Sequence, residues 1–322
     1  MDHMEGKKEP PDGSDVSPHE TAMVTDRDSP TFFHQVMPSR VTHHLPQNTW
    51  YGLEESARWS IRFDPLKGNV LVSKKRISAG TEILQEKALI IHAVKDKILK
   101  TCCSCGLAVP YVAGRLPPTF CDTCNPPWKD IEIDAFCSLW PAAWKSGTVV
   151  HSLRILHTVC SLSLQEIETF SQLGRVFPDR PVDHESHWTS AGELVAAQLQ
   201  GEYKEKMDKL RGLLDNNLLN INKITNANSF GYDVMGVYLQ SSILSHSCDP
   251  NCRWEINGNN LTIHSLREID EDEEITVCYV PLVNTWGLDL RRAVIARRRG
   301  FLCMCDRCKV EEEELEKADP LR

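Results

Sequence analysis

The sequence has no long hydrophobic run and no excess of positive charge. Its apolar stretches, such as Ala88–Ile91, are far shorter than the about 20 residues of a membrane-spanning helix. The chain does not begin with a charged and then apolar segment, so we expect neither a membrane anchor nor secretion. Acidic residues outnumber basic ones by 45 to 36, giving a net charge of −9. This balance argues against direct nucleic-acid binding.

The composition is otherwise that of a globular protein. Hydrophobic residues make up 41% and charged residues 25% of 322 residues, which excludes a mainly disordered, collagen-like or coiled-coil chain. We find no internal repeat. Residues 1–56 are rich in Pro, Ser, Asp, His and Glu and lack apolar periodicity, so we predict a disordered arm there.

Cysteine is the informative residue type, with 13 in the chain. Without a secretory signal a disulfide framework is not expected, whereas reduced cysteines at short intervals usually hold metal. Two Cys-x2-Cys pairs are separated by fifteen residues, and their four thiolates can surround one zinc ion tetrahedrally. The predicted ligands are Cys102, Cys105, Cys121 and Cys124, with the adjacent Cys103 left over.

A second group of cysteines lies near the end of the chain. Cys303, Cys305 and Cys308 offer three ligands within six residues, but structural zinc prefers four. The missing ligand must come from elsewhere, and the residues themselves leave Cys248 and Cys252 open. Both belong to the segment Ser-His-Ser-Cys-Asp-Pro-Asn-Cys.

Strand signals occur on both sides of a helical stretch. Short β-branched runs at 61–63, 70–72 and 81–91 predict strands, and Asn257–Gly258 predicts a hairpin turn between strands at 253–256 and 260–266. Another strand is expected over 274–280. Capping-box patterns predict helices that begin at Ser163 and Ser190, the second continuing to about residue 216, and a basic helix is expected over 289–299.

Three motifs together carry a resemblance to a known family. The segment 245–252, the strand Glu273–Tyr279 and the terminal cysteines, in this order, resemble SET-domain protein lysine methyltransferases. The cysteine insert and the helical stretch after it resemble the SET-and-MYND (SMYD) branch, with a reduced insert that holds one zinc and no C-terminal helical-repeat domain. The resemblance covers about residues 57–310.

The resemblance implies an α+β fold: short β-sheets of a SET domain, a helical insertion, a small zinc insert and a post-SET zinc cluster. The expected divisions are 1–56 arm; 57–100 first part of the SET domain; 101–127 MYND-like zinc insert; 128–225 helical insertion; 226–281 core SET domain; 282–310 post-SET zinc cluster; and 311–322 acidic, solubilising tail.

The resemblance also implies roles for individual residues. Tyr279 and Phe230 match the aromatic residues of the catalytic lysine channel, and Cys248 becomes the fourth post-SET zinc ligand beside Cys303, Cys305 and Cys308. The residues that match contacts to S-adenosylmethionine are Lys67, Gly68, Asn69, Asn228, Ser245, His246, Tyr279 and Phe301.

These matches predict an S-adenosylmethionine-dependent protein-lysine methyltransferase with two structural zinc ions, acting on a histone or another protein. We expect a monomer in the nucleus, the cytoplasm or both. A second hypothesis is a catalytically weak SET-type zinc-binding interaction module, because Val70, Ser245 and Arg299 depart from the family pattern. Arg291, Arg292 and 297–299 are interpreted as a solvated helix face.

Overall fold

The computed structural model describes residues 56–318, except for 94, 113, 115–117, 174–184, 216–217, 219–220, 222–223, 226–227, 232–233 and 281–284. The predicted N-terminal arm therefore lies, apart from residue 56, outside the described residues. Residue 216, where the helix predicted to begin at Ser190 was expected to end, also lies outside the described residues.

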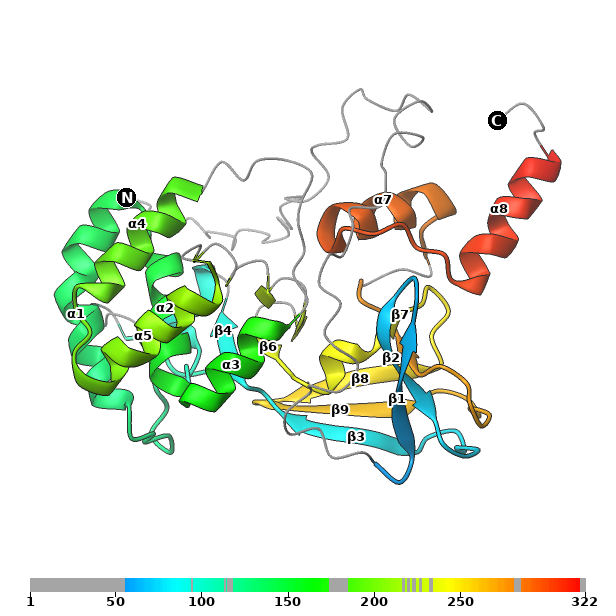
Figure 1. Ribbon diagram of the computed structural model, residues 1–322, viewed down its shortest axis with the longest axis horizontal. Helices are drawn as coiled ribbons and strands as arrows, with labels where there is room; N and C mark the ends of the chain where they lie inside the picture. The colour runs from blue at the N-terminus through cyan, green and yellow to red at the C-terminus, as the bar shows by residue number, and fades with distance from the viewer. Residues whose placement is uncertain are drawn as a thin grey trace, which may run out of the picture. The chain divides into compact units, whose positions relative to one another are not determined.

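Short strands form four small sheets. The strands are β1 Trp59–Asp64, β2 Gly68–Ser73, β3 Glu82–Lys87, β4 Ile90–Ala93, β5 Ser229–Gly231, β6 Val234–Val237, β7 Ser245–His246, β8 Cys252–Asn257, β9 Asn260–Ser265 and β10 Thr276–Val277. The sheets have the orders β1-β2, β3-β9-β8, β4-β6-β5 and β10-β7, and only the last pairing is parallel among those described. These sheets and the helices between them form a mixed α+β fold (Figure 1).

The predicted hairpin is confirmed, whereas one predicted strand divides into two. β8 and β9 pair through Asn257 and Asn260, and Gly258 adopts the positive φ of 62° that this tight turn requires. The run 81–91 forms β3 and β4, because the chain leaves its partner β9 and joins β6 at Ala88 and Leu89. The strand expected over 274–280 is reduced to Thr276–Val277.

The helices are α1 Lys129–Ser146, α2 Val149–Ser161, α3 Leu164–Gln172, α4 Glu185–Ala196, α5 Gly201–Leu213, α7 Leu288–Arg299 and α8 Asp306–Ala318, with the 3-10 helices η2 Lys95–Lys100 and η3 Ser241–Ile243. The capping box at Ser163 is confirmed. The one predicted at Ser190 is wrong, because α4 begins earlier and Ser190 lies inside it. Among the described residues, no helix combines the length and hydropathy that crossing a bilayer requires.

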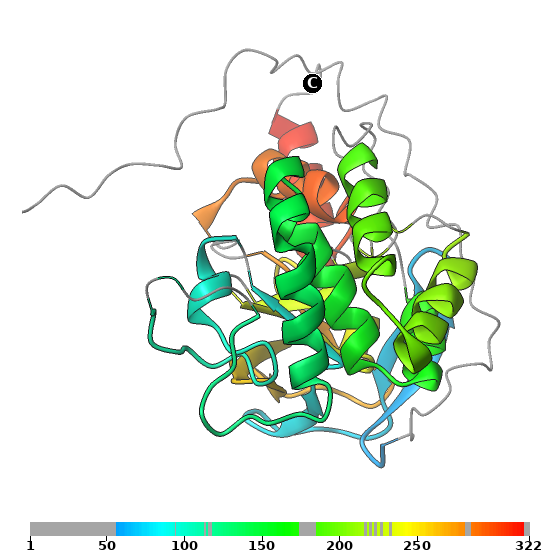
Figure 2. The same ribbon diagram turned by 90° about the vertical axis from the view of Figure 1, so that its left-hand side faces the viewer.

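Three apolar cores are found among the described residues, the smallest of them around Leu288 and Ile295 of α7. Helices α1–α5 share a core with Ile90 of β4 and Val237 of β6, so they pack on that small sheet. Figure 2 shows these helices, in shades of green, gathered on the side that faces the viewer. A second core lies among the strands and contains Leu71, Tyr238 and Ile263. Phe230 of β5, in the same sheet, and Tyr238, directly after β6, belong to this second core, so the β4-β6-β5 sheet connects the helices to the strands that carry the candidate site.

The C-terminal helices differ from the sequence interpretation. Arg291 and Arg292 of α7 were expected on a solvated face, yet they are 0% and 7% exposed. Each forms an ion pair with α8, Arg291 with Glu311 and Arg292 with Glu312. The acidic run interpreted as a solubilising tail therefore begins inside a helix that docks on α7. The periodicity of α7 in the sequence does not reveal that α8 packs against it. It therefore could not distinguish a basic helix face exposed to solvent from one covered by acidic residues.

We expect Ser163→Ala to destabilise the protein by about 1 kcal/mol, because it removes the capping hydrogen bond to Glu166 N at 3.2 Å. Ser190→Ala, at an exposed position inside α4, is the matched control and should change stability by less than about 0.5 kcal/mol. Urea unfolding measures both. Equal losses for the two variants would contradict the assignment of the cap.

Candidate functional site

A parallel crossing of two short strands forms the centre of the candidate site. Ser245 of β7 pairs with Thr276 of β10, and His246 pairs with Val277. The crossing brings together His246 and Tyr279, whose ring centroids are 5.3 Å apart. The backbone N–H of Tyr279 donates to His246 Nδ1 at 3.1 Å. Two segments that are about thirty residues apart in the chain thus share one small site.

Asn251 holds this crossing together. Its side chain is buried, and its Nδ2 donates to Glu273 Oε1 at 2.9 Å and to the Glu274 carbonyl at 2.8 Å. Its Oδ1 accepts the backbone N–H of Thr276 at 2.8 Å. The sequence analysis assigned no role to Asn251, although its place in the segment 245–252 was a usable signal.

Tyr279 lies just after β10, and both its ring and its hydroxyl make contacts. The hydroxyl donates to the Leu244 carbonyl, and the Arg299 guanidinium lies 5.1 Å from the ring centroid. Burial raises the pKa of Tyr279 to about 12. The side chain is therefore a neutral phenol near pH 7, able to orient a polar group but not to act as a strong base.

A cleft opens beside Tyr279 with an empty volume of about 360 Å³, including the open space at its mouth. Phe230 of β5 and Trp254 of β8 meet edge to face in it, with ring centroids 5.8 Å apart. Trp254 Nε1 donates to the Cys278 carbonyl at 3.0 Å, which fixes the indole. The lining residues are Asn228, Ser229, Phe230, Gly231, Ser241, Ser242, Trp254, Tyr279 and Arg299. The sequence analysis missed Trp254, because the alternating pattern of its strand does not indicate which residues line a cleft.

Two further predicted residues lie on this cleft or directly beside it. Asn228 is buried, and its Nδ2 donates to the Ile224 carbonyl at 2.8 Å. Phe230 is 7% exposed and packs against both Trp254 and Tyr238. Between them, the buried hydroxyl of Ser229 has no hydrogen-bond partner among the described residues. An unsatisfied hydroxyl in a cleft wall is a group that a bound molecule can use.

The predicted early turn joins β1 to β2. Gly68 has φ of 83° there, which a residue with a side chain rarely adopts. Lys67 forms an ion pair with Glu274, whose carbonyl accepts from Asn251. Val70, by contrast, is buried in the regular β2 ladder opposite Arg62. Its position needs no unusual backbone angles, so valine fits the strand.

His246 links the cleft to the second cysteine cluster. Its Nδ1 accepts the Tyr279 N–H, so the proton is on Nε2, which donates to Cys248 Sγ at 3.4 Å. Burial lowers the pKa of His246 to about 4, which keeps the ring neutral. The ring centroid of Phe301 lies 6.3 Å from that of His246 and 6.5 Å from that of Tyr279. The three rings form one aromatic group.

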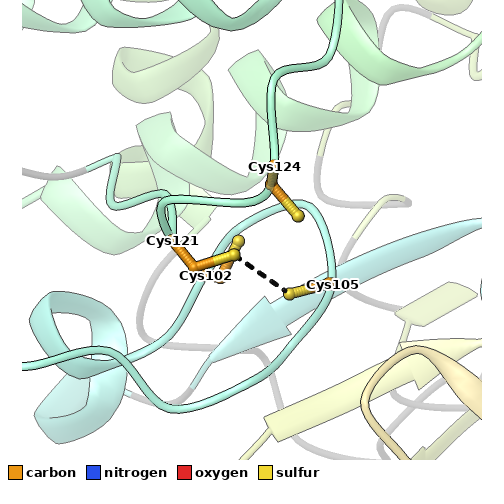
Figure 3. Close-up of side chains that lie close together, drawn as sticks. All are labelled: Cys102, Cys105, Cys121 and Cys124. Atoms are coloured by element: carbon orange, nitrogen blue, oxygen red, sulfur yellow. Dashed lines mark hydrogen bonds between the residues drawn. The ribbon is translucent and has the colours of Figure 1, made fainter.

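The first cysteine cluster is built by two loops. Figure 3 shows Cys102 and Cys105 on one loop facing Cys121 and Cys124 on the other, and their sulfur atoms all lie within 4.8 Å of one another. The Sγ atoms of Cys105 and Cys121 are 3.8 Å apart. The first loop rests on the β8–β9 hairpin, where Asn259 Nδ2 donates to the Ser104 carbonyl at 3.5 Å.

The second cysteine cluster joins Cys248 to Cys303, Cys305 and Cys308, again with all sulfur atoms within 4.8 Å. Cys248 Sγ lies 3.8 Å from Cys303 Sγ and 3.6 Å from Cys308 Sγ. The open alternative, Cys252, is buried at the start of β8, in the core between the strands. The structure thus supplies Cys248 as the fourth member of the cluster.

Both clusters have the chemistry of a metal site. Burial raises the pKa of the Cys105 thiol to about 12, whereas a hydrogen bond with the Thr123 hydroxyl lowers the pKa of Cys121 to about 6. In the second cluster, hydrogen bonds among the thiols raise the pKa of Cys248 and lower that of Cys308 to about 6. Thiolates are the form that binds metal. Four sulfur ligands at this spacing suit tetrahedral zinc, which would fill every coordination position and leave none open for catalysis.

A family model described as SET domain matches residues 68–280, which is more than half of the chain. The match includes the β7–β10 crossing, Tyr279 and the first cysteine cluster. It ends before the three terminal cysteines, which the structure nevertheless joins to Cys248.

Curated relatives agree with this match. Histone-lysine N-methyltransferase SET5 of Eremothecium gossypii is 26% identical over 304 residues, covering 78% of this chain and 61% of that protein. Histone-lysine N-methyltransferase SMYD3 of Mus musculus is 38% identical over 80 residues, covering 25% of this chain and 18% of that protein. The chain thus spans about three fifths of the first relative.

Among solved structures, the SET domain of LSMT bound to lysine and AdoHcy aligns with a TM-score of 0.33 and 13% identity. The alignment covers 78% of this chain and 54% of that one.

Asn251→Ala should destabilise the protein by about 2–4 kcal/mol, because it leaves buried backbone groups at the crossing without partners. Asn259→Ala is the matched control, since it removes a single long hydrogen bond at 3.5 Å from a half-buried side chain and should cost less than about 1 kcal/mol. Denaturant unfolding in metal-saturated buffer compares them. Similar losses would show that Asn251 does not lock the crossing.

Proposed function

Because the chain belongs to the SET-domain family, we propose that it is an S-adenosylmethionine-dependent protein-lysine methyltransferase. One observation carries the proposal: the β7–β10 crossing sets Tyr279 against His246 and Phe301 beside a cleft walled by Phe230 and Trp254. A narrow aromatic cleft with a neutral phenol at its end suits a lysine side chain.

The residues present fit the cofactor. The Ser229 hydroxyl is buried at the cleft wall without a partner among the described residues, and Asn228 lies beside it in the chain. The aromatic group formed by His246, Tyr279 and Phe301 offers flat apolar surface next to these polar atoms. We assign cofactor contacts to Asn228, Ser245, His246, Tyr279 and Phe301, and to the turn residues Lys67, Gly68 and Asn69.

When bound, S-adenosylmethionine supplies a methyl group on a positively charged sulfonium. The lysine must reach it as the neutral amine, although free lysine has a pKa of about 10.4. A lysine amine placed against the apolar rings of Phe230 and Trp254 would lose contact with water, which disfavours the ammonium and lowers that pKa. The Tyr279 hydroxyl donates to the Leu244 carbonyl, so its oxygen lone pairs remain free to accept an amine N–H and aim the nitrogen.

We assign a structural zinc ion to each cysteine cluster. The ligands are Cys102, Cys105, Cys121 and Cys124 in the first, and Cys248, Cys303, Cys305 and Cys308 in the second. The second ion would fix Phe301, two residues before Cys303, against Tyr279 and His246. It therefore supports the cofactor site without taking part in the chemistry.

The substrate class is a protein or peptide that presents a lysine, either a histone or another protein. The two relatives described above are named histone-lysine N-methyltransferases. A nuclear location accompanies a histone substrate, and a cytoplasmic location remains compatible with other proteins.

A specific observation favours the second hypothesis, an interaction module with weak transfer activity. Arg299 lines the cleft and lies over the Tyr279 ring, so its cation stands where the substrate ammonium must approach. Calorimetric titration with S-adenosylmethionine followed by an assay on cell extract discriminates the two. Cofactor binding without transfer to any protein would favour the module.

We expect two zinc ions per chain by elemental analysis of metal-saturated protein. Cys305→Ser should lower the content to one and weaken cofactor binding, because the segment that carries Phe301 loses its anchor. Cys103→Ser is the control, since Cys103 lies outside both clusters, and it should retain two. A wild-type content of one or three would contradict the assignment.

Tyr279→Phe should reduce methyl transfer by about tenfold to a thousandfold, because the group that aims the amine is lost while the aromatic wall remains. Folding should change by no more than about 1–2 kcal/mol, and cofactor binding should be retained. The assay uses labelled S-adenosylmethionine with histones and cell extract. Tyr238→Phe, at a buried tyrosine behind Phe230, is the control and should keep its activity. Wild-type rates in Tyr279→Phe would show that Tyr279 is only a core residue.

A further inference from the structure

The second cysteine cluster poses an electrostatic problem. Four thiolates around Zn²⁺ carry a net charge of −2, and Cys248, Cys303 and Cys308 are at most 1% exposed. A buried charge is costly unless other charges and hydrogen bonds compensate it. In the first cluster only Cys102 is fully buried, so the other three thiolates retain contact with water.

Arg291 of α7 provides the most direct compensation. Its side chain is 0% exposed, and its Nη2 donates to Cys308 Sγ at 3.7 Å. Nη1 donates to the Trp286 carbonyl at 2.7 Å, and Nη2 also meets Glu311 Oε2 at 2.7 Å. The Trp286 carbonyl, just before α7, and the Glu311 carboxylate of α8 therefore hold one guanidinium on one ligand sulfur.

Two more arginines bind the backbone of the same cluster. Arg292 Nε donates to the Cys303 carbonyl at 3.1 Å, and its Nη2 donates to Glu312 at 2.9 Å. Arg307 Nη1 donates to the Cys248 carbonyl at 3.2 Å, while its Nε donates to Glu311 at 2.8 Å. Arg291, Arg292 and Arg307 thus approach three different cysteines. Glu311 of α8 binds both Arg291 and Arg307, and Glu312 binds Arg292.

We propose that Arg291 is a positioning residue for the second cluster, whose N–H donation to Cys308 and positive charge retain the metal there. The docked acidic face of α8 aims the guanidinium, so the Arg291–Glu311 pair acts as part of the metal site. This inference rests on the zinc assignment under the proposed function. In the first cluster, among the described residues, the hydrogen bond given to Cys121 Sγ comes from the neutral Thr123 hydroxyl at 3.1 Å.

The test is the release of zinc from the full chain to an excess of a chromogenic chelator. In Arg291→Met, one of the two zinc ions should leave about tenfold faster, since a charged donor to a buried thiolate is lost. The other ion, in the first cluster, is an internal standard and should leave at the wild-type rate. Arg297→Met is the matched control, because Arg297 is exposed on the same helix and should change neither rate.

Replacing zinc with Co²⁺ gives an absorption spectrum that a loss of protein stability alone would not shift. Removing a donor from a ligand sulfur raises the energy of its lone pairs, so the sulfur-to-cobalt charge-transfer band should shift to longer wavelength in Arg291→Met. Arg291→Lys keeps the charge but cannot reach Trp286, Glu311 and Cys308 together, so we expect an intermediate release rate. It also serves as the test if the methionine variant does not fold.

The outcomes separate this inference from the zinc assignment. A wild-type protein with fewer than two zinc ions would overturn the assignment and the inference with it. A wild-type protein with two ions, together with unchanged release and an unchanged cobalt spectrum in the folded Arg291 variants, would overturn the inference alone. Equal acceleration of both ions would also overturn it, because a general loosening of the fold would then explain the effect.

Discussion

The side-chain amide of Asn251, which follows β7 in the chain, satisfies backbone groups of the segment that forms β10. Strands two residues long cannot hold each other by their own ladder, so a buried amide that bonds to the Glu274 carbonyl and the Thr276 N–H fixes their register. A shift of one residue would turn Tyr279 away from His246. The aromatic group, the cleft wall and the approach to the second cluster all depend on that register.

His246 connects the cleft to the second cysteine cluster through its two ring nitrogens. One ring nitrogen accepts from the Tyr279 backbone, and the other donates to Cys248. A single neutral imidazole thus joins the candidate catalytic tyrosine to a candidate metal ligand. Phe301 packs against the second cysteine cluster and also contacts Tyr279. The cleft, His246 and these cysteines are therefore linked in a closed ring of contacts.

Local signals in the sequence predicted local features well. The hairpin at Asn257–Gly258 and the cap at Ser163 are formed by neighbouring residues, and spacing alone grouped the first four cysteines. The division of 81–91 depends on two distant partners, β9 and β6, which no short window contains. The burial of Arg291 and the place of Trp254 likewise result from tertiary packing, which overrides helical and strand periodicity.

The second cluster closes a much longer stretch of chain than the first. Cys248 and Cys303 are 55 residues apart, whereas Cys105 and Cys121 are 16 apart. Treated as cross-links, these closures would remove about 4 and about 3 kcal/mol of chain entropy from the unfolded state. During synthesis the first knuckle can close early. The aromatic group of His246, Tyr279 and Phe301 can assemble only after Cys308 has left the ribosome. A nascent or truncated chain would therefore contain a folded first cysteine cluster before the candidate site is complete.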